Sequence, residues 1–314
     1  MEKLPLILAL TASLLACGEQ TTRHPLPIGR PWIPSPSDAG EPLELDAGAL
    51  ESGMGGPDAA SSRAEAGTGP RRGLSIRFDY RFDTAGFFAD PERRQTLEAA
   101  ARDWSAVITN DFPTVPAGTV VMARDPVGLN SPATPIAIED DIDDLVVFVG
   151  AAADLSAALA TATLDLGLDG IVDGQQFIDL SDRRRSTPFQ PWAASISFDS
   201  TAAFHFDPEP ELDRPVPAAL HDFYSVALHE LGHVLGFGRS LPFQALVSGG
   251  TFTGPAATAL NGGPLPLAPD LGHVPVRFLF EGQRVLMDAG DPPGTRQRPT
   301  ALDRAVLEDL GYRF

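Results

Sequence analysis

The sequence predicts an α+β domain that runs from about residue 74 to the C-terminus at residue 314. Segments in which apolar and polar residues alternate are typical of half-buried strands, and longer segments with apolar residues at helical spacing are typical of helices packed on a core. Helices are predicted at residues 90–110, at residues 218–236 and near the C-terminus. The length allows one large domain or two small ones.

Local signals support each element. Leu74–Tyr80 alternates like a strand, and Asp90 followed by Pro91 is a typical helix start, because Asp caps the free N–H groups and Pro fits the first helical position. The apolar stripe of this helix is formed by Leu97, Ala100, Ala101, Trp104, Val107 and Ile108. Further strands are predicted at residues 119–123, 144–150, 194–199 and 276–280.

The helix at residues 218–236 is expected to open after Pro215 to Pro217, and Thr300 is expected to cap the last helix. The helix at residues 218–236 can pack into the core through Phe223, Val226, Ala227, Leu231 and Val234. Residues 240–270 are rich in Gly and Pro and are predicted to form a long surface excursion.

Composition excludes some classes of function. The formal net charge is −19 and the sequence pI is about 4.5, which argues against a nucleic-acid partner because such partners need a basic patch. One cysteine allows no intrachain disulfide. After the N-terminus, no apolar run is long enough to span a bilayer.

The N-terminus predicts export. Leu4 to Leu15 is a short apolar core that follows Lys3, and it fits a secretory signal peptide at residues 1–16. The sequence Leu-Leu-Ala-Cys that ends at Cys17 resembles the lipobox of bacterial lipoproteins, which implies cleavage before Cys17 and its acylation. Gly18 is not the aspartate that often retains such proteins on the inner membrane, so we expect the outer membrane or cell surface, or secretion if the cysteine is incidental.

The composition of residues 17–73 predicts a disordered tether. They are dense in Pro, Gly, Ala, Ser and Glu and nearly devoid of aromatic residues, so they cannot bury enough surface to order themselves. An inhibitory propeptide is the alternative, but Cys17 is already assigned to the lipobox. Further along, Asp165, Asp169 and Asp173 stand among glycines and favour either a solvated acidic turn or a Ca²⁺ loop, although no established calcium-loop spacing is matched.

The helix predicted at residues 218–236 carries the sequence H-E-x-x-H. On a helix, His229 and His233 lie on one face, one turn apart, and can offer two imidazole nitrogens to one Zn²⁺ ion. Glu230 stands beside the first of them, where a carboxylate can accept a proton from water activated by the metal. Gly236 follows at the spacing of a longer pattern, H-E-x-x-H-x-x-G-x-x-H, but Arg239 occupies the place of the last histidine and has no lone pair to donate.

A catalytic zinc ion normally has three protein ligands. His24 lies in the tether, His205 lies in an acidic loop, and His221 would be about 12 Å from His229 along the helix, too far for a shared metal. His273 is therefore the predicted third ligand. Glu281 or Glu308 is the alternative, as in gluzincins.

These motifs resemble the metzincin clan of zinc metalloproteases, in particular matrixins and the leishmanolysin-like group in which an insertion displaces the third histidine. The resemblance rests on residues 225–239 and 273–312, including Met287, which matches the methionine of the Met-turn, and the Gly311-Tyr312 ending. It implies a mixed twisted sheet, a long active-site helix, a C-terminal helix and a substrate-binding edge strand at residues 194–199 or its neighbour. No tyrosine stands two residues after Met287, so the tyrosine ligand of astacins and serralysins is not expected.

The predicted function is thus that of an exported zinc endopeptidase acting on proteins or peptides, with Glu230 as general base and His229, His233 and His273 as ligands. The alternatives are a catalytically decayed, zinc-binding surface lipoprotein and a hydrolase of another substrate. The intact Glu230 weighs against decay, because a binding scaffold does not need that carboxylate.

Overall fold

The computed structural model describes residues 73–128, 133–153, 155, 158–164 and 183–314. The predicted signal peptide, Cys17 and the tether up to residue 72 lie outside the described residues, as do Asp165, Asp169 and Asp173. Within the described part, no helix combines the length and apolar character needed to cross a membrane.

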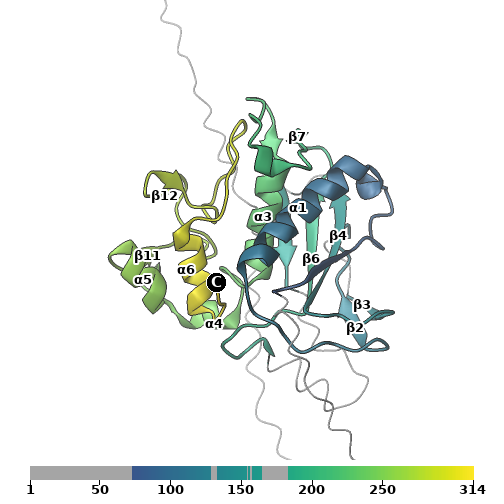
Figure 1. Cartoon of the computed structure of the whole chain (residues 1–314), viewed down its shortest axis with the longest axis horizontal. Helices are drawn as coiled ribbons and strands as arrows, with labels where there is room; N and C mark the ends of the chain where they lie inside the picture. The colour runs from purple at the N-terminus through teal and green to yellow at the C-terminus, as the bar shows by residue number, and fades with distance from the viewer. Residues whose placement is uncertain (1–72, 129–132, 154, 156–157, 165–182) are drawn as a thin grey trace, which may run out of the picture. The chain divides into compact units, whose positions relative to one another are not determined.

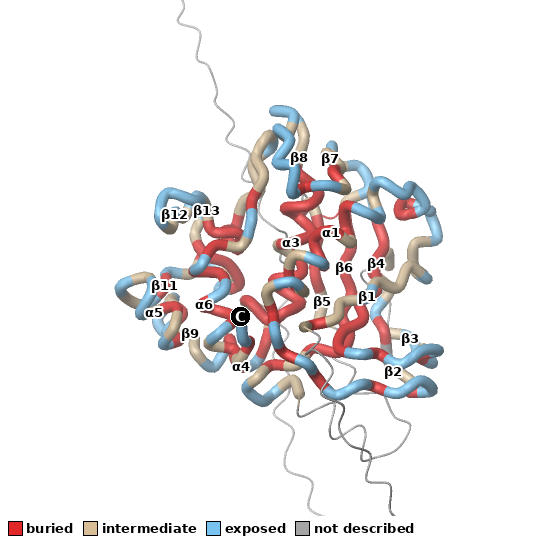
Figure 2. The backbone as a smooth tube through the Cα atoms, viewed as in Figure 1, coloured by how far each residue is buried: buried red, intermediate tan, exposed pale blue. Residues whose placement is uncertain are grey.

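A four-stranded sheet, in the order β1-β4-β6-β5, forms the half of the domain drawn on the right in Figure 1. β1 (Ile76–Asp79), β4 (Leu145–Ala152) and β6 (Ala193–Asp199) are parallel, whereas β5 (Ala160–Thr163) runs antiparallel to β6. β4 and β6 are buried along nearly their whole length, as Figure 2 shows, because both faces of a central strand are covered. The predicted α+β class with a mixed sheet is therefore confirmed.

Two candidates were expected for the edge strand, residues 194–199 or their neighbour, and the edge is the neighbour. Residues 194–199 belong to β6, which is hydrogen-bonded to β4 on one side and to β5 on the other, so they form an interior strand. The edge strand beside the long helix is the neighbour, β5. Its signal was weak in the sequence because Ala160–Thr163 contains only Ala and Thr.

α1 (Pro91–Val107) begins where it was predicted, with Asp90 accepting a hydrogen bond from the N–H of Glu92. It ends at Val107, short of the predicted Asn110, because Ile108 is already extended. Trp104, from the buried stripe of α1, donates its ring N–H to the carbonyl of Leu228 at 3.1 Å and so ties α1 to α3.

α3 (Phe223–Val234) starts later than predicted. The residues before it form β8 (His221–Asp222), which pairs with β7 (Phe204–His205), and the carboxylate of Asp222 caps the N–H of Ser225. A capping carboxylate, not the prolines upstream, therefore fixes the first turn. The five residues predicted to pack this helix into the core are all buried.

The segment after α3 is more structured than the predicted surface excursion. Phe243, Phe252 and Leu265 are fully buried in the main core, because short elements form between the glycines and prolines. These elements are α4 (Leu241–Ala245), β9 (Val247–Ser248), β10 (Thr251–Phe252), α5 (Pro255–Asn261) and β11 (Leu265–Pro266).

The C-terminal part closes the domain with α6 (Ala301–Asp309), which packs against α5 (Figure 1). Thr300 caps it as predicted, and Asp303 completes a capping box with Thr300. The strand predicted at residues 276–280 is reduced to a hairpin of β12 (Leu279–Phe280) and β13 (Gln283–Arg284). The remaining elements are η1 (Phe87–Ala89), β2 (Val120–Ala123), β3 (Thr134–Ala137) and η2 (Pro210–Leu212).

Candidate metal centre

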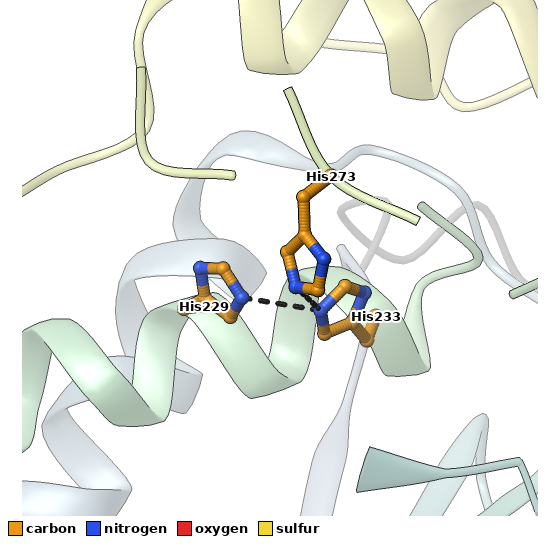
Figure 3. Close-up of side chains that lie close together, drawn as sticks. All are labelled: His229, His233 and His273. Atoms are coloured by element: carbon orange, nitrogen blue, oxygen red, sulfur yellow. Dashed lines mark hydrogen bonds between the residues drawn. The ribbon is translucent and has the colours of Figure 1, made fainter. Parts of the chain in front are cut away.

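Three histidines from two distant parts of the chain meet beside α3. His229 and His233 lie one turn apart on the helix, and His273 follows the segment inserted after it. Nε2 of His233 lies 3.1 Å from Nε2 of His229 and 2.9 Å from Nε2 of His273 (Figure 3). One ligand atom from each residue lies within 4.8 Å of the other two.

The other nitrogen of each ring is held by an acceptor. Nδ1 of His229 lies 2.9 Å from the carbonyl oxygen of Leu286, and Nδ1 of His233 lies 2.9 Å from that of Phe237. Nδ1 of His273 lies 2.7 Å from Oδ2 of Asp270. Carbonyl and carboxylate oxygens only accept, so Nδ1 carries the proton in each ring and the Nε2 lone pairs converge on one another.

Converging lone pairs repel unless a cation lies between them, and this is the arrangement that metal-ligating histidines adopt. Burial, with the neighbouring histidines adding to it, lowers the pKa of His229 to about 3 and that of His233 well below its usual value. Both rings are therefore neutral near pH 7, which is the form that binds a metal.

The donor set fits zinc. Three imidazoles at bonding distances of about 2.0–2.1 Å in tetrahedral geometry stand roughly 3.4 Å apart, close to the two separations seen here. Neither alternative glutamate joins this cluster: Glu281 and Glu308 are both exposed, and the potential metal-binding group found in the described residues contains histidines alone. Arg239 is likewise outside the cluster.

Two glycines route the chain to the third histidine. Gly236 and Gly238 have φ of 109° and 68°, which residues with a Cβ rarely adopt. Gly238 also lies directly against Gly272, since a Cβ on Gly238 would be 2.2 Å from the carbonyl oxygen of Gly272. The inserted segment therefore leaves and rejoins the centre at one place.

Met287 lies under α3. A Cβ on Gly232 would be 2.5 Å from Sδ of Met287, so the missing side chain makes room for this buried methionine. The backbone around Met287 is joined to the segment of His273, because the N–H of Val274 donates to the carbonyl of Met287 and the N–H of Ala289 donates to the carbonyl of Val274. The turn at Met287 thus contacts both α3 and the segment that carries His273.

Asp303 of α6 stabilises the turn at Met287. Its carboxylate accepts the N–H groups of Leu286 and Met287, both at 3.1 Å, and also the backbone N–H and the hydroxyl of Thr300. Leu286 in turn accepts from His229. Neither this role of Asp303 nor that of Asp270 was predicted from the sequence. The signals for them are an Asp three residues before His273 and an acidic residue in the first turn of the last helix.

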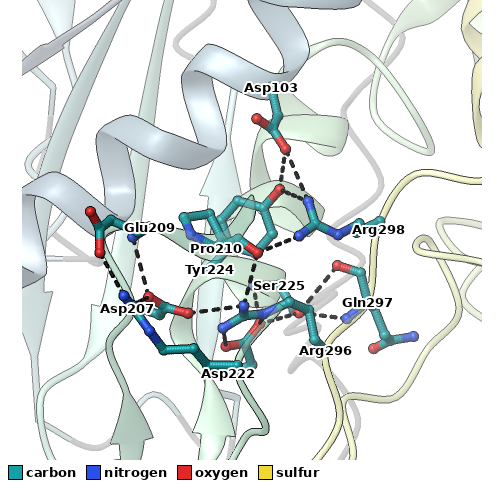
Figure 4. Close-up of polar contacts among 11 residues, drawn as sticks. Asp103, Asp207, Glu209, Pro210, Asp222, Tyr224, Ser225, Arg296, Gln297 and Arg298 are labelled. Atoms are coloured by element: carbon teal, nitrogen blue, oxygen red, sulfur yellow. Dashed lines mark hydrogen bonds and ion pairs between the residues drawn. The ribbon is translucent and has the colours of Figure 1, made fainter. Parts of the chain in front are cut away.

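An ionic network fixes the start of α3 (Figure 4). Arg296, whose side chain is 7% exposed, donates to both carboxylate oxygens of Asp222, at 2.9 and 3.1 Å, and to Asp207 at 3.0 Å. Ser225 donates to Asp222 and accepts from the N–H of Gln297. The chain that follows the Met287 turn is thereby joined to the first turn of α3.

Two further residues were considered from the sequence, Glu230 as general base and His221 as a histidine too distant to share the metal. Glu230 follows His229 on α3 and is buried, with 1% of its surface exposed. His221 precedes the helix, and its Nδ1 lies 3.0 Å from the carboxylate of Asp291.

A scan against models of protein families found no match, and a search among curated proteins found no significant match either.

Proposed function

We propose that this chain is a zinc-dependent endopeptidase with a metzincin-like catalytic domain. The observation that carries the proposal is the set of three Nε2 atoms brought together with each Nδ1 already held by an acceptor, beside a buried glutamate on the same helix. His229, His233 and His273 would hold the metal. When bound, zinc supplies a Lewis acid that lowers the pKa of water and polarises a carbonyl.

Residues of the chain transfer the proton and orient the metal-binding rings. Glu230 accepts the proton of the attacking water and delivers it to the leaving amine, so no nucleophilic Ser or Cys is required. Asp270 orients His273, and the carbonyls of Leu286 and Phe237 orient the other two rings.

The substrate would lie along β5. An extended peptide can add to an exposed sheet edge by main-chain hydrogen bonds, and β5 is the edge strand that packs beside α3. Of the two strands expected to bind substrate, residues 194–199 or their neighbour, this proposal takes the neighbour.

The Glu230→Ala variant tests the mechanism. It is expected to retain one zinc ion per chain and to lose hydrolysis of an unfolded protein, whereas the wild type cleaves that protein, is inhibited by a chelator and recovers when zinc is added. The exposed Glu308→Ala is the control and should cleave normally. Full activity of Glu230→Ala would refute the mechanism, and a wild type that binds zinc without cleaving would favour a decayed surface protein.

Metal analysis tests the ligand set. His273→Ala should lose zinc, while Arg239→Ala should keep it. Undiminished zinc affinity in His273→Ala would overturn the assignment.

We also propose that the protein is exported and lipid-anchored at Cys17, on the signal-peptide and lipobox pattern of residues 1–17. Labelling cells with a fatty-acid analogue should mark the wild type and not Cys17→Ser. Unlabelled wild-type protein would contradict the anchor and leave the enzymatic proposal intact.

A further inference from the structure

A cavity of about 610 Å³ lies beside the metal centre. Its walls come from the end of β5, from the chain after α3 and from the residues just before His273, and they include Ala162, Thr163, Leu164, Val247, Asp270 and Leu271. Oδ2 of Asp270 lies 2.7 Å from Nδ1 of His273, so one residue of the wall contacts a proposed zinc ligand. The volume is that of a ligand site, since such sites measure about 300–1,000 Å³.

The cavity also lies at the end of the strand along which the proposed substrate is placed. Ala162 and Thr163 are the last two residues of β5, and Leu164 follows them. β5 is paired with β6 on one side only, because it is the last strand of its sheet. An extended peptide added to the other side would have alternate side chains on each face, so one that reaches the end of β5 brings a side chain to the cavity.

Leu271 is the exposed apolar residue of the cavity wall. Its side chain is 43% exposed, and its φ of 59° lies in the left-handed region that leucine rarely adopts. The turn is fixed by its neighbours, because the N–H of Leu271 donates to the carbonyl of Ala268 and the N–H of Gly272 donates to Asp270, both at 2.9 Å. Backbone strain of this kind is concentrated at ligand-binding sites.

Two further apolar side chains extend this surface inward. Leu164 and Val247, which both line the cavity, are partly buried and pack against the main hydrophobic core. Leu271 therefore does not stand alone on a polar surface. It belongs to a wall that joins an exposed apolar side chain to the core of the domain.

Two polar residues of the lining already have partners within the chain. Oδ1 of Asp270 accepts the N–H groups of Gly272 and His273, at 2.9 and 3.2 Å, and Oδ2 lies against the His273 ring. The side-chain amide of Gln244 donates to the carbonyl of Arg239 at 3.3 Å. Both oxygens of Asp270 thus serve the third histidine and its turn, which leaves the apolar residues as the part of the wall without such a task.

We infer that this cavity binds a large apolar side chain of the substrate, of the size of leucine or phenylalanine, and that Leu271 determines this specificity. Such a side chain removes its own apolar surface and that of Leu271 from water, which alanine in the same place does to a much smaller extent. The inference rests on the proposed peptidase function and names the class of peptide that it prefers.

Binding measured without hydrolysis tests the inference. The full chain carrying Glu230→Ala is loaded with zinc and titrated with alanine-rich hexapeptides that have a fluorophore at the N-terminus and an amide at the C-terminus. One position at a time is changed to Leu, Phe, Asp or Lys. At one position, the Leu and Phe peptides should bind at least about tenfold tighter than the alanine peptide, the scale of burying one such side chain.

Leu271→Asn, added to the same chain, should abolish this preference. Asn adopts the left-handed conformation more readily than Leu, so the turn is kept while the apolar surface is lost. Leu271→Met keeps an apolar side chain and should retain most of the preference. Leu260→Asn is the matched control, because Leu260 on α5 is also 43% exposed and lies outside the cavity lining.

Several results would overturn the inference. They are equal affinity for the Leu, Phe and alanine peptides at every position, tighter binding of the Asp or Lys peptides, and a preference that survives Leu271→Asn. Zinc affinity should be unchanged in Leu271→Asn, and a variant that lost zinc together with the preference would assign Leu271 a structural role instead.

The outcome is separable from the proposed function, because cleavage by the wild type is measured independently. If the wild type cleaves peptides without regard to a large apolar residue, only the inference on Leu271 fails. If it holds zinc and cleaves nothing, the peptidase proposal fails, while the titrations still decide whether the cavity binds apolar side chains.

Discussion

Gly238 and Gly272 lie in backbone contact, although the chain between them forms two helices and a three-stranded sheet. If residues 239–272 are left out, the sequence joins Gly238 to His273 and becomes His-Val-Leu-Gly-Phe-Gly-His, the spacing of an uninterrupted H-x-x-G-x-x-H pattern. In the H-x-x-G-x-x-H pattern Arg239 stands where the last histidine is expected. The contact explains how His273 can take that place in space, because the residues at the two ends of the inserted segment lie next to each other.

This contact predicts a loss of zinc affinity in Gly238→Ala. The new Cβ meets the backbone of Gly272, which cannot move aside without displacing His273, so we expect zinc to bind at least about tenfold more weakly. Gly250→Ala is the matched control, because Gly250 has φ of 79° and open space around it. Both variants carry the strain of positive φ, about 1–2 kcal/mol, but only Gly238→Ala should affect zinc in a competition titration. Equal zinc affinities would show that the contact does not position the ligand.

Asp270 should contribute to metal binding without touching the metal. Asp270→Asn weakens the acceptor that orients His273, and the expected loss of zinc affinity is about 10–100-fold. Asp291→Asn serves as comparison, because Asp291 also pairs with a histidine but lies outside the centre. A similar affinity in both variants would argue against the orienting role of Asp270.

Asp303 should link the stability of α6 to the metal centre. In Asp303→Asn, an N–H₂ group faces backbone donors, and each buried N–H left without an acceptor costs about 1–3 kcal/mol. Asp309→Asn on the same helix is the control, since Asp309 accepts the N–H groups of Ala256 and Ala257 in the inserted segment. Denaturant unfolding should show losses in both variants, and zinc titration should show weaker binding in Asp303→Asn alone. Unchanged zinc affinity in Asp303→Asn would contradict the link.

His221 should make the free energy of unfolding depend on pH. The hydrogen bond and charge of Asp291 raise the pKa of His221 above 6.5, although burial acts against them. The folded state therefore binds the proton more tightly than the unfolded state, so this stabilisation is complete below about pH 6.5 and is lost as pH rises through the raised pKa. The difference in unfolding free energy between wild type and His221→Gln should shrink over that range. A difference that is constant with pH would exclude His221 as its source.

Arg296 should be among the most sensitive positions for stability. Arg296→Met leaves Asp207 and Asp222 buried without their shared cation, and breaking a buried ion pair in this way costs about 3–5 kcal/mol. Arg214 also pairs with Asp207 but is about half exposed, so Arg214→Met should cost far less. Chemical denaturation of both variants measures the contrast, and equal losses would contradict it.

The sequence by itself determined what depends on neighbours along the chain. Helical spacing alone puts His229 and His233 on one face of α3, Asp90 and Thr300 begin their helices as predicted, and alternation or apolar runs located the central strands. Elimination and resemblance could nominate His273 but could not bring it to the helix.

Only the tertiary structure decided which distant groups meet. It replaced the Pro215–Pro217 helix start by the Asp222 cap, made β5 the sheet edge, and placed Asp303 behind the Met287 turn. These outcomes depend on contacts between residues far apart in sequence, whose loop-closure cost and packing leave no local pattern. The third histidine is the sharpest case, because its place depends on a backbone contact between Gly238 and Gly272 that no periodicity encodes.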